Sequence, residues 1–198
     1  ASFNVKSYFT TLFSFLVLKL DILIISYLLT KTDVGLYSFS VSFIDYVYLL
    51  PVVISTVIFQ KYSSISSLVE RVSIHSKVCS IFFTLYLLFL GAVYLLLDYV
   101  VLYLFGEQYL PATDYIEILL FAIYFLGCST ILQQFLVSSG FPKILVFLWG
   151  MAVLINVAIN FIYIPEYGVY AAAYSTLITY ALIFFSSLIL IKFYKFSK

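Results

Sequence analysis

The sequence predicts an all-α integral membrane protein, built as a bundle of six transmembrane helices. Two features of its composition indicate this class: 65% of the 198 residues are hydrophobic and only 10% are charged, whereas soluble domains average about 25% charged residues. The third observation is that long apolar segments alternate with short polar ones. A soluble enzyme of ordinary composition is therefore excluded, and the apolar content also excludes intrinsic disorder. A formal charge of +1 leaves no basic surface for nucleic acid.

Charged and turn-forming residues delimit six segments within a single membrane domain, residues 1–198. A helix needs about 20 apolar residues to cross a hydrocarbon core of about 30 Å. A transmembrane β-barrel is the alternative, but residues 81–90 do not alternate polar and apolar side chains as barrel strands do. We expect helices at residues 9–29, 34–59, 78–104, 115–137, 144–164 and 169–193.

The basic residues predict the orientation of the bundle. With a cytoplasmic N-terminus, the cytoplasmic side receives Lys6, Lys61, Arg71, Lys77, Lys143, Lys192, Lys195 and Lys198. Because cytoplasmic loops carry an excess of Lys and Arg, both termini are predicted to be cytoplasmic. The polar stretch 60–77 is then a cytoplasmic loop, in which His75 is expected to be a solvated side chain.

Three ionisable residues fall inside the first two predicted helices: Lys19, Asp21 and Asp45. Each costs about 2.5–3.5 kcal/mol at membrane depth unless it has a partner or an aqueous cavity. Lys19 and Asp21 are two positions apart and face different ways, whereas a rise of about 1.5 Å per residue puts Lys19 and Asp45 at one depth. We expect Lys19 and Asp45 to meet near the midplane and Asp21 to face something else. Two interpretations stay open: a structural ion pair, or a water-filled cavity in which Lys19 attracts an anionic head group and either Asp21 or Asp45 modulates it.

The fifth predicted helix carries Asn156 and Asn160, which are four positions apart and share one face. Their amides are expected to bond to a neighbouring helix, and Gln133 and Gln134 of the fourth helix are expected at the membrane interface. One His and two distant Cys cannot close a metal site, so we expect no metal, no cofactor and no enzyme activity. The candidate substrate or ion pathway is Lys19, Asp21, Asp45, Asn156 and Asn160.

Several motifs together resemble one transporter family. They are LDILI at 20–24, VGLYS at 34–38, FGEQY at 105–109 with Ala112, NVAIN at 156–160, and IPEYGV at 164–169 with Ala172, Ala173 and Thr176. They are similar to motifs of polysaccharide transporters in the multidrug/oligosaccharidyl-lipid/polysaccharide exporter superfamily, in particular the Wzx-type O-antigen and capsule flippases. The chain departs from the family at Ala171, usually Gly, at Ser175, usually Ala, and at residues 60–61, where a Pro is common.

The resemblance implies that the chain is the C-terminal lobe of a larger MATE-like transporter, and its start at Ala1 rather than Met fits a piece of a longer chain. It implies alternating access around a central cavity shared with an N-terminal lobe, in the bacterial cytoplasmic membrane. The implied cargo is an undecaprenyl-pyrophosphate-linked oligosaccharide, moved from the inner to the outer leaflet among membrane lipid. Lys19 is then the candidate that contacts the pyrophosphate.

Two alternatives remain open. A cation-coupled drug or metabolite exporter of the MATE type shares this fold, and Asp21 and Asp45 would bind Na⁺ or H⁺ in it. A membrane scaffold or assembly subunit is the second alternative. It predicts a bundle without a cavity, in which all polar groups at mid-depth are paired.

Overall fold

The computed structural model describes residues 3–140 and 143–196. In this part of the chain the elements are α1 (Phe3–Leu28), α2 (Lys31–Ser64), α3 (Leu68–Phe105), a short 3₁₀ helix η1 (Glu107–Ala112), α4 (Thr113–Ser138), α5 (Lys143–Tyr167) and α6 (Val169–Phe196). Six of the helical segments are long and apolar enough to cross a membrane. The prediction of an all-α bundle with six transmembrane helices is confirmed.

The helices α2 and α3 are long, with 34 and 38 residues. They continue through most of the stretch 60–77, in place of the expected loop, because this stretch contains neither Gly nor Pro to interrupt a helix. Thr30 and Asp33 form a capping box at the start of α2, and the hydroxyl of Ser67 accepts a bond from Glu70 N–H at the start of α3. These caps satisfy backbone donors that have no partner within the helix.

The extension of these helices corrects the expectation for His75. Its side chain is not solvated but buried. The Tyr62 hydroxyl lies 3.0 Å from His75 Nδ1, and the Phe135 ring lies 4.9 Å from the imidazole, centroid to centroid. The neighbouring Arg71 and Lys77 suggested solvent, but His75 occupies the inward face of α3.

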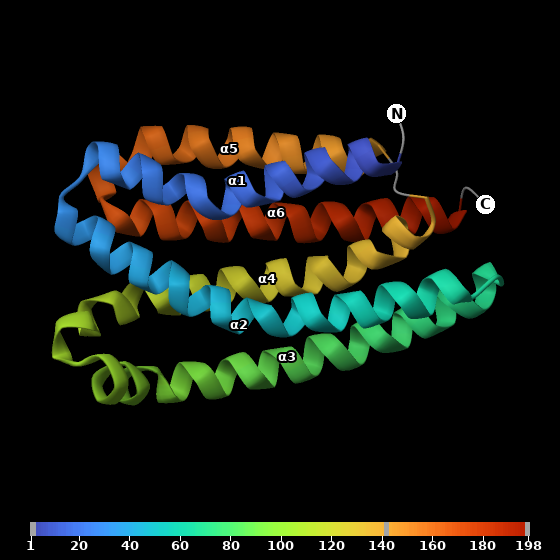
Figure 1. Cartoon of the computed structure of the whole chain (residues 1–198), viewed down its shortest axis with the longest axis horizontal. Helices are drawn as coiled ribbons and strands as arrows, with labels where there is room; N and C mark the ends of the chain where they lie inside the picture. The colour runs from blue at the N-terminus through green and yellow to red at the C-terminus, as the bar shows by residue number, and fades with distance from the viewer. Residues whose placement is uncertain (1–2, 141–142, 197–198) are drawn as a thin grey trace.

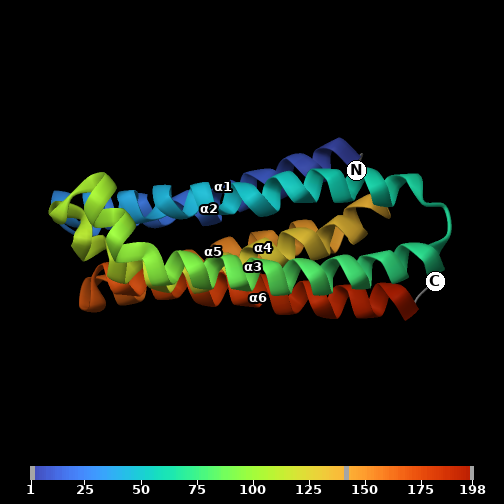
Figure 2. The same ribbon diagram turned by 90° about the horizontal axis from the view of Figure 1, so that it is seen from below.

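The six long helices form two groups (Figure 1). One group contains α1, α5 and α6, and the other contains α2, α3 and α4, with the most extensive packing between α4 and α6 joining them. By contrast, α1 and α2 contact each other little and diverge from their connecting turn at Leu29 and Thr30, as Figure 1 shows. Seen from below in Figure 2, α1 and α2 lie on one side of the bundle and α3 and α6 on the other. The divergence separates α1 from α2 on the side where α1 begins.

The second group is packed most tightly at Gly127 of α4. A Cβ atom at this position would lie 2.5 Å from Cε1 of Tyr86 in α3 and 3.2 Å from Cγ of Pro51 in α2. Because real side-chain atoms do not approach this closely, only glycine lets the three helices meet here. Gly127 therefore fixes the position of α4, which also lines the site described next.

Candidate functional site

Lys19 and Asp45 form an ion pair that joins α1 to α2. Lys19 Nζ lies 2.5 Å from Asp45 Oδ2, so the expected meeting of these two side chains is confirmed. The short turn between the helices makes them antiparallel. Residues at similar distances from that turn therefore lie at similar depth.

The ion pair is only partly covered by the bundle. The side chains are 35% exposed for Lys19 and 42% for Asp45, and both lie well inside segments able to span a membrane. A charged group in contact with hydrocarbon at this depth costs about 2.5–3.5 kcal/mol. Pairing lowers this cost, and a pair that stays partly exposed is better accommodated by water or further protein than by lipid.

Asp21 lies on a different face of α1 and is buried, with 3% of its surface exposed. Its carboxylate accepts hydrogen bonds from three helices: from the Tyr37 hydroxyl of α2 at 3.0 Å, the Asn160 amide of α5 at 2.7 Å and the Thr176 hydroxyl of α6 at 2.5 Å. Within the described residues, no basic side chain forms an ion pair with it. Asp21 is thus a buried acid held by neutral donors alone.

The two asparagines extend this cluster across α5 and α6. Asn160 Nδ2 also donates to Asn156 Oδ1 at 3.2 Å, and Asn156 Nδ2 donates to the Ser175 hydroxyl at 3.2 Å. The expected bonding of the two amides to neighbouring helices is confirmed. In the described part of the chain the buried Oδ1 of Asn160 has no hydrogen-bond partner.

The oxygen atoms around Asp21 give the cluster its chemistry. Carboxylate, amide and hydroxyl oxygens are the ligands that hard cations take in proteins, and a buried carboxylate can also hold a proton. The groups that face the Asp21 carboxylate are donors: Asn160 Nδ2 and the hydroxyls of Tyr37 and Thr176. The cluster therefore offers a buried carboxylate that can hold a proton, surrounded by side chains whose oxygens are of the kind that bind small cations.

A polar cavity of about 350 Å³ lies between the two helix groups. Leu18, the neighbour of Lys19, and Tyr48, one turn after Asp45, are among its lining residues, so the cavity extends to within one helical turn of the ion pair. Its polar lining comes from α1, α2, α4 and α5: Thr10, Thr11, Ser14, Tyr48, Thr130, Gln133, Gln134 and Trp149. These hydroxyl, amide and indole groups offer both donors and acceptors of hydrogen bonds.

The interfacial depth expected for Gln133 stays a prediction, but its side chain lies inside the bundle. Gln133 is buried, with 7% of its surface exposed. It accepts a bond from Trp149 Nε1 at 3.1 Å and donates to the Ser187 hydroxyl at 2.9 Å, so it links α4 to α5 and α6. Gln134 is half-buried in the wall of the cavity.

The structure divides the predicted residues into two places. Lys19 and Asp45 meet beside the cavity, and Asp21, Asn156 and Asn160 meet inside the bundle. Sequence reasoning missed the remaining members of these sites: Tyr37, Ser175 and Thr176 around Asp21, and Tyr48 with Thr130 in the cavity wall. Tyr37 and Thr176 belong to the motifs that resemble the transporter family, but those motifs did not indicate a hydrogen bond to Asp21.

Three comparisons with known proteins complete the description. A family model described as "polysaccharide biosynthesis protein" matches residues 1–114, more than half of the chain. The matched segment contains α1, α2 and α3, and with them Lys19, Asp21 and Asp45. The searches of curated proteins and of solved structures returned no match.

Proposed function

The chain belongs to the polysaccharide biosynthesis protein family, and on this premise we propose that it moves lipid-linked oligosaccharide repeat units across the membrane for cell-surface polysaccharide. The observation that carries the proposal is the partly exposed Lys19–Asp45 pair, which lies beside a polar cavity and inside two helices able to span a membrane. The cargo is an undecaprenyl-pyrophosphate-linked oligosaccharide. The membrane is the bacterial cytoplasmic membrane, with both termini on the cytoplasmic side.

The two parts of such a cargo match the two parts of the site. Sugar hydroxyls both donate and accept hydrogen bonds, as do the hydroxyl and amide side chains that line the cavity. The pyrophosphate is an anion, for which a lysine serves as a point charge. Asp45 is the ion-pair partner of Lys19 in the empty state, and the pyrophosphate replaces Asp45 as its partner.

Movement of the cargo requires the cavity to open to each side in turn. In transporters of this kind two rigid bundles rock around a site near the midplane. The half-exposed pair fits a second lobe, the N-terminal lobe of the same transporter, across the cavity from α1 and α2. The Asp21 cluster, which joins four helices, is the site at which a coupling proton or cation would act.

A cation-coupled drug or metabolite exporter of the MATE type is the second candidate, and the buried Asp21, which forms no ion pair with a described basic side chain, favours it. The scaffold alternative expects paired polar groups and a closed bundle. The exposure of Lys19 and Asp45 and the polar cavity count against it.

The proposal is tested in cells that depend on this chain for surface polysaccharide. Deletion is expected to abolish the surface polymer and to leave lipid-linked repeat units on the cytoplasmic face. Lys19→Gln is expected to reproduce this loss when transport is expressed per molecule of protein in the membrane. Lys31→Gln, which removes an exposed lysine at the start of α2, is the matched control and should transport normally. Normal surface polysaccharide with lost tolerance to a cationic dye would overturn the proposal in favour of the drug exporter.

A further inference from the structure

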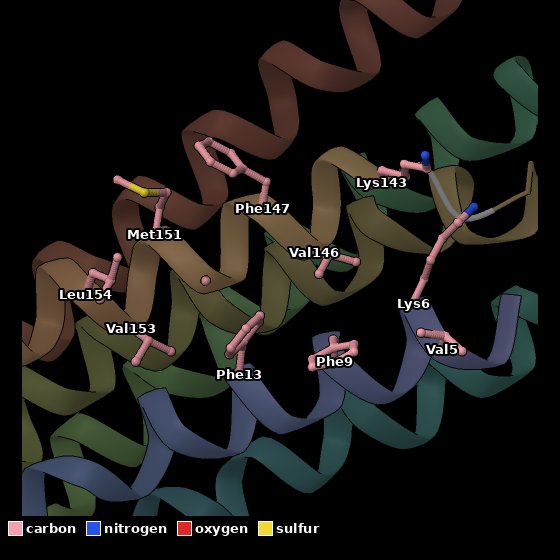
Figure 3. A pocket seen from close by; sticks show the side chains of 11 residues that line it. Val5, Lys6, Phe9, Phe13, Lys143, Val146, Phe147, Met151, Val153 and Leu154 are labelled. Atoms are coloured by element: carbon pink, nitrogen blue, oxygen red, sulfur yellow. The ribbon is translucent and has the colours of Figure 1, made fainter. Parts of the chain in front are cut away.

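A groove runs along the outside of the bundle between α1 and α5, apart from the polar cavity. It has a volume of about 680 Å³ and is lined by residues 5–13 of α1 and 143–154 of α5. Its described lining is apolar, with Phe9, Phe13 and Phe147 prominent, except for Lys6 and Lys143. Figure 3 shows these two lysines together at one end of the groove.

The length of the groove matches one leaflet of a bilayer. The eleven helical steps from Lys143 to Leu154 rise about 16 Å, about half of a hydrocarbon core of about 30 Å. Both lysines lie at the start of their helices, where the chain enters the apolar segment. The groove therefore extends from the head-group level to about the midplane.

The charge at the end of the groove selects among lipids. Lys6 and Lys143 contribute two positive charges, and the positive end of the α5 dipole lies at the same place. None of the described lining residues is acidic. An anionic phosphate is therefore favoured over a zwitterionic head group. A second copy of the chain fits less well, because copies in one membrane share an orientation and would bring their own lysines to the same depth.

We propose that this groove binds one anionic phospholipid, with an acyl chain along Phe9, Phe13 and Phe147 and its phosphate at Lys6 and Lys143. The proposal does not depend on transport. A lipid bound in this groove covers the contact between α1 and α5 near the helix ends that carry Lys6 and Lys143.

The test uses the whole chain reconstituted in phosphatidylcholine vesicles that contain a small fraction of phosphatidylglycerol with a photoactivatable acyl chain. After illumination, labelled peptides are expected within residues 5–13 and 143–154. Unlabelled phosphatidylglycerol should compete with the label, and additional phosphatidylcholine should not. Equal competition by both lipids, label confined to other helices, or chain-to-chain contact through this face would overturn the proposal.

Two variants distinguish the contribution of the two lysine charges to lipid binding from the contribution of the groove's shape. Lys6→Gln with Lys143→Gln is expected to reduce competition by phosphatidylglycerol about fivefold for each lysine, the usual contribution of a basic residue near an anionic membrane surface. Its matched control is Lys61→Gln with Lys77→Gln, which removes two exposed lysines near the connection of α2 and α3 and should change nothing.

Gly150→Leu fills the groove without changing charge. The nearest atoms that a Cβ at this position would meet belong to the Phe13 ring, at 3.4 Å or more, which is ordinary contact, so the fold is expected to persist. Labelling of both segments should then fall several-fold. Unchanged labelling in this variant and in the double lysine variant would show that the groove does not hold the lipid.

Discussion

The side-chain amide of Asn160 donates to Asp21 Oδ1 across 2.7 Å and so ties α5 to α1 in the interior of the bundle. Asn160→Leu keeps a side chain of similar size but removes this donor, which leaves the buried carboxylate with one partner fewer. The expected loss of stability is about 1.5–3 kcal/mol, the range for a hydrogen bond to a charged group. Thermal unfolding in detergent measures it. Ser42→Ala, which removes an exposed hydroxyl bonded only within α2, should leave the melting temperature unchanged.

The Lys19–Asp45 pair lends itself to a double-variant experiment. Lys19→Gln leaves Asp45 without its cation at membrane depth, so protein abundance is measured alongside transport in Lys19→Gln, Asp45→Asn and the combined variant. We expect the combined variant to match or exceed the abundance of either single variant, because no charge is then left unpaired. Transport should remain lost, since the proposed contact with the pyrophosphate requires the cation of Lys19. Recovery of both protein abundance and transport in the combined variant would show that the pair only stabilises the α1–α2 hairpin.

Replacement of glycine by alanine is expected to have opposite effects on stability at Gly127 and at Gly91. Gly127→Ala places a methyl group against Tyr86 and Pro51, and overpacking of this kind costs about 1–3 kcal/mol. Gly91 lies exposed inside α3, and a Cβ added there would have no neighbouring atom within 4 Å. Gly91→Ala should therefore stabilise the protein by about 0.5–1 kcal/mol through helix propensity. Melting temperatures that move in the same direction would contradict this account of the α2–α3–α4 contact.

The hydrogen bond between Gln133 and Trp149 can be monitored by fluorescence, because Trp149 is the single tryptophan of the chain. Gln133→Leu removes the acceptor of the Trp149 indole N–H and leaves a buried donor unpaired, at a cost of about 1–3 kcal/mol. The fluorescence emission of Trp149 is expected to move to shorter wavelength as its surroundings become less polar. Gln134→Leu, in the same cavity wall but without this bond, is the control. An unshifted emission in Gln133→Leu would mean that the two side chains do not meet in solution.

The helices and one contact could be predicted from the sequence because they depend on local quantities. Apolar length determines how many segments cross a membrane. The Lys19–Asp45 contact follows from counting residues on both sides of a short turn. Neither inference requires knowledge of how distant helices are arranged.

The partners of Asp21 and Gln133 could not be predicted in this way. They depend on α1 packing against α5 and on α4 packing against α6, and weak amphipathicity in apolar helices does not reveal which faces meet. For polar residues near a helix end, such as Gln133 and His75, the sequence neighbours point to water. The burial of His75 comes from α2 and α3, which run further than the apolar segments do, whereas the burial of Gln133 comes from α5 and α6, which pack beside α4.

The length of the α2–α3 hairpin has a mechanical consequence. At about 1.5 Å per residue the two helices measure about 51 and 57 Å, well beyond the apolar thickness of about 30 Å, and they meet at the connection 65–67. The hairpin therefore acts as a lever, whose tip travels further than the part within the lipid when the helices tilt. A fluorophore attached at the exposed Ser66 would therefore report helix rotations that are too small to detect in the part of the hairpin within the lipid.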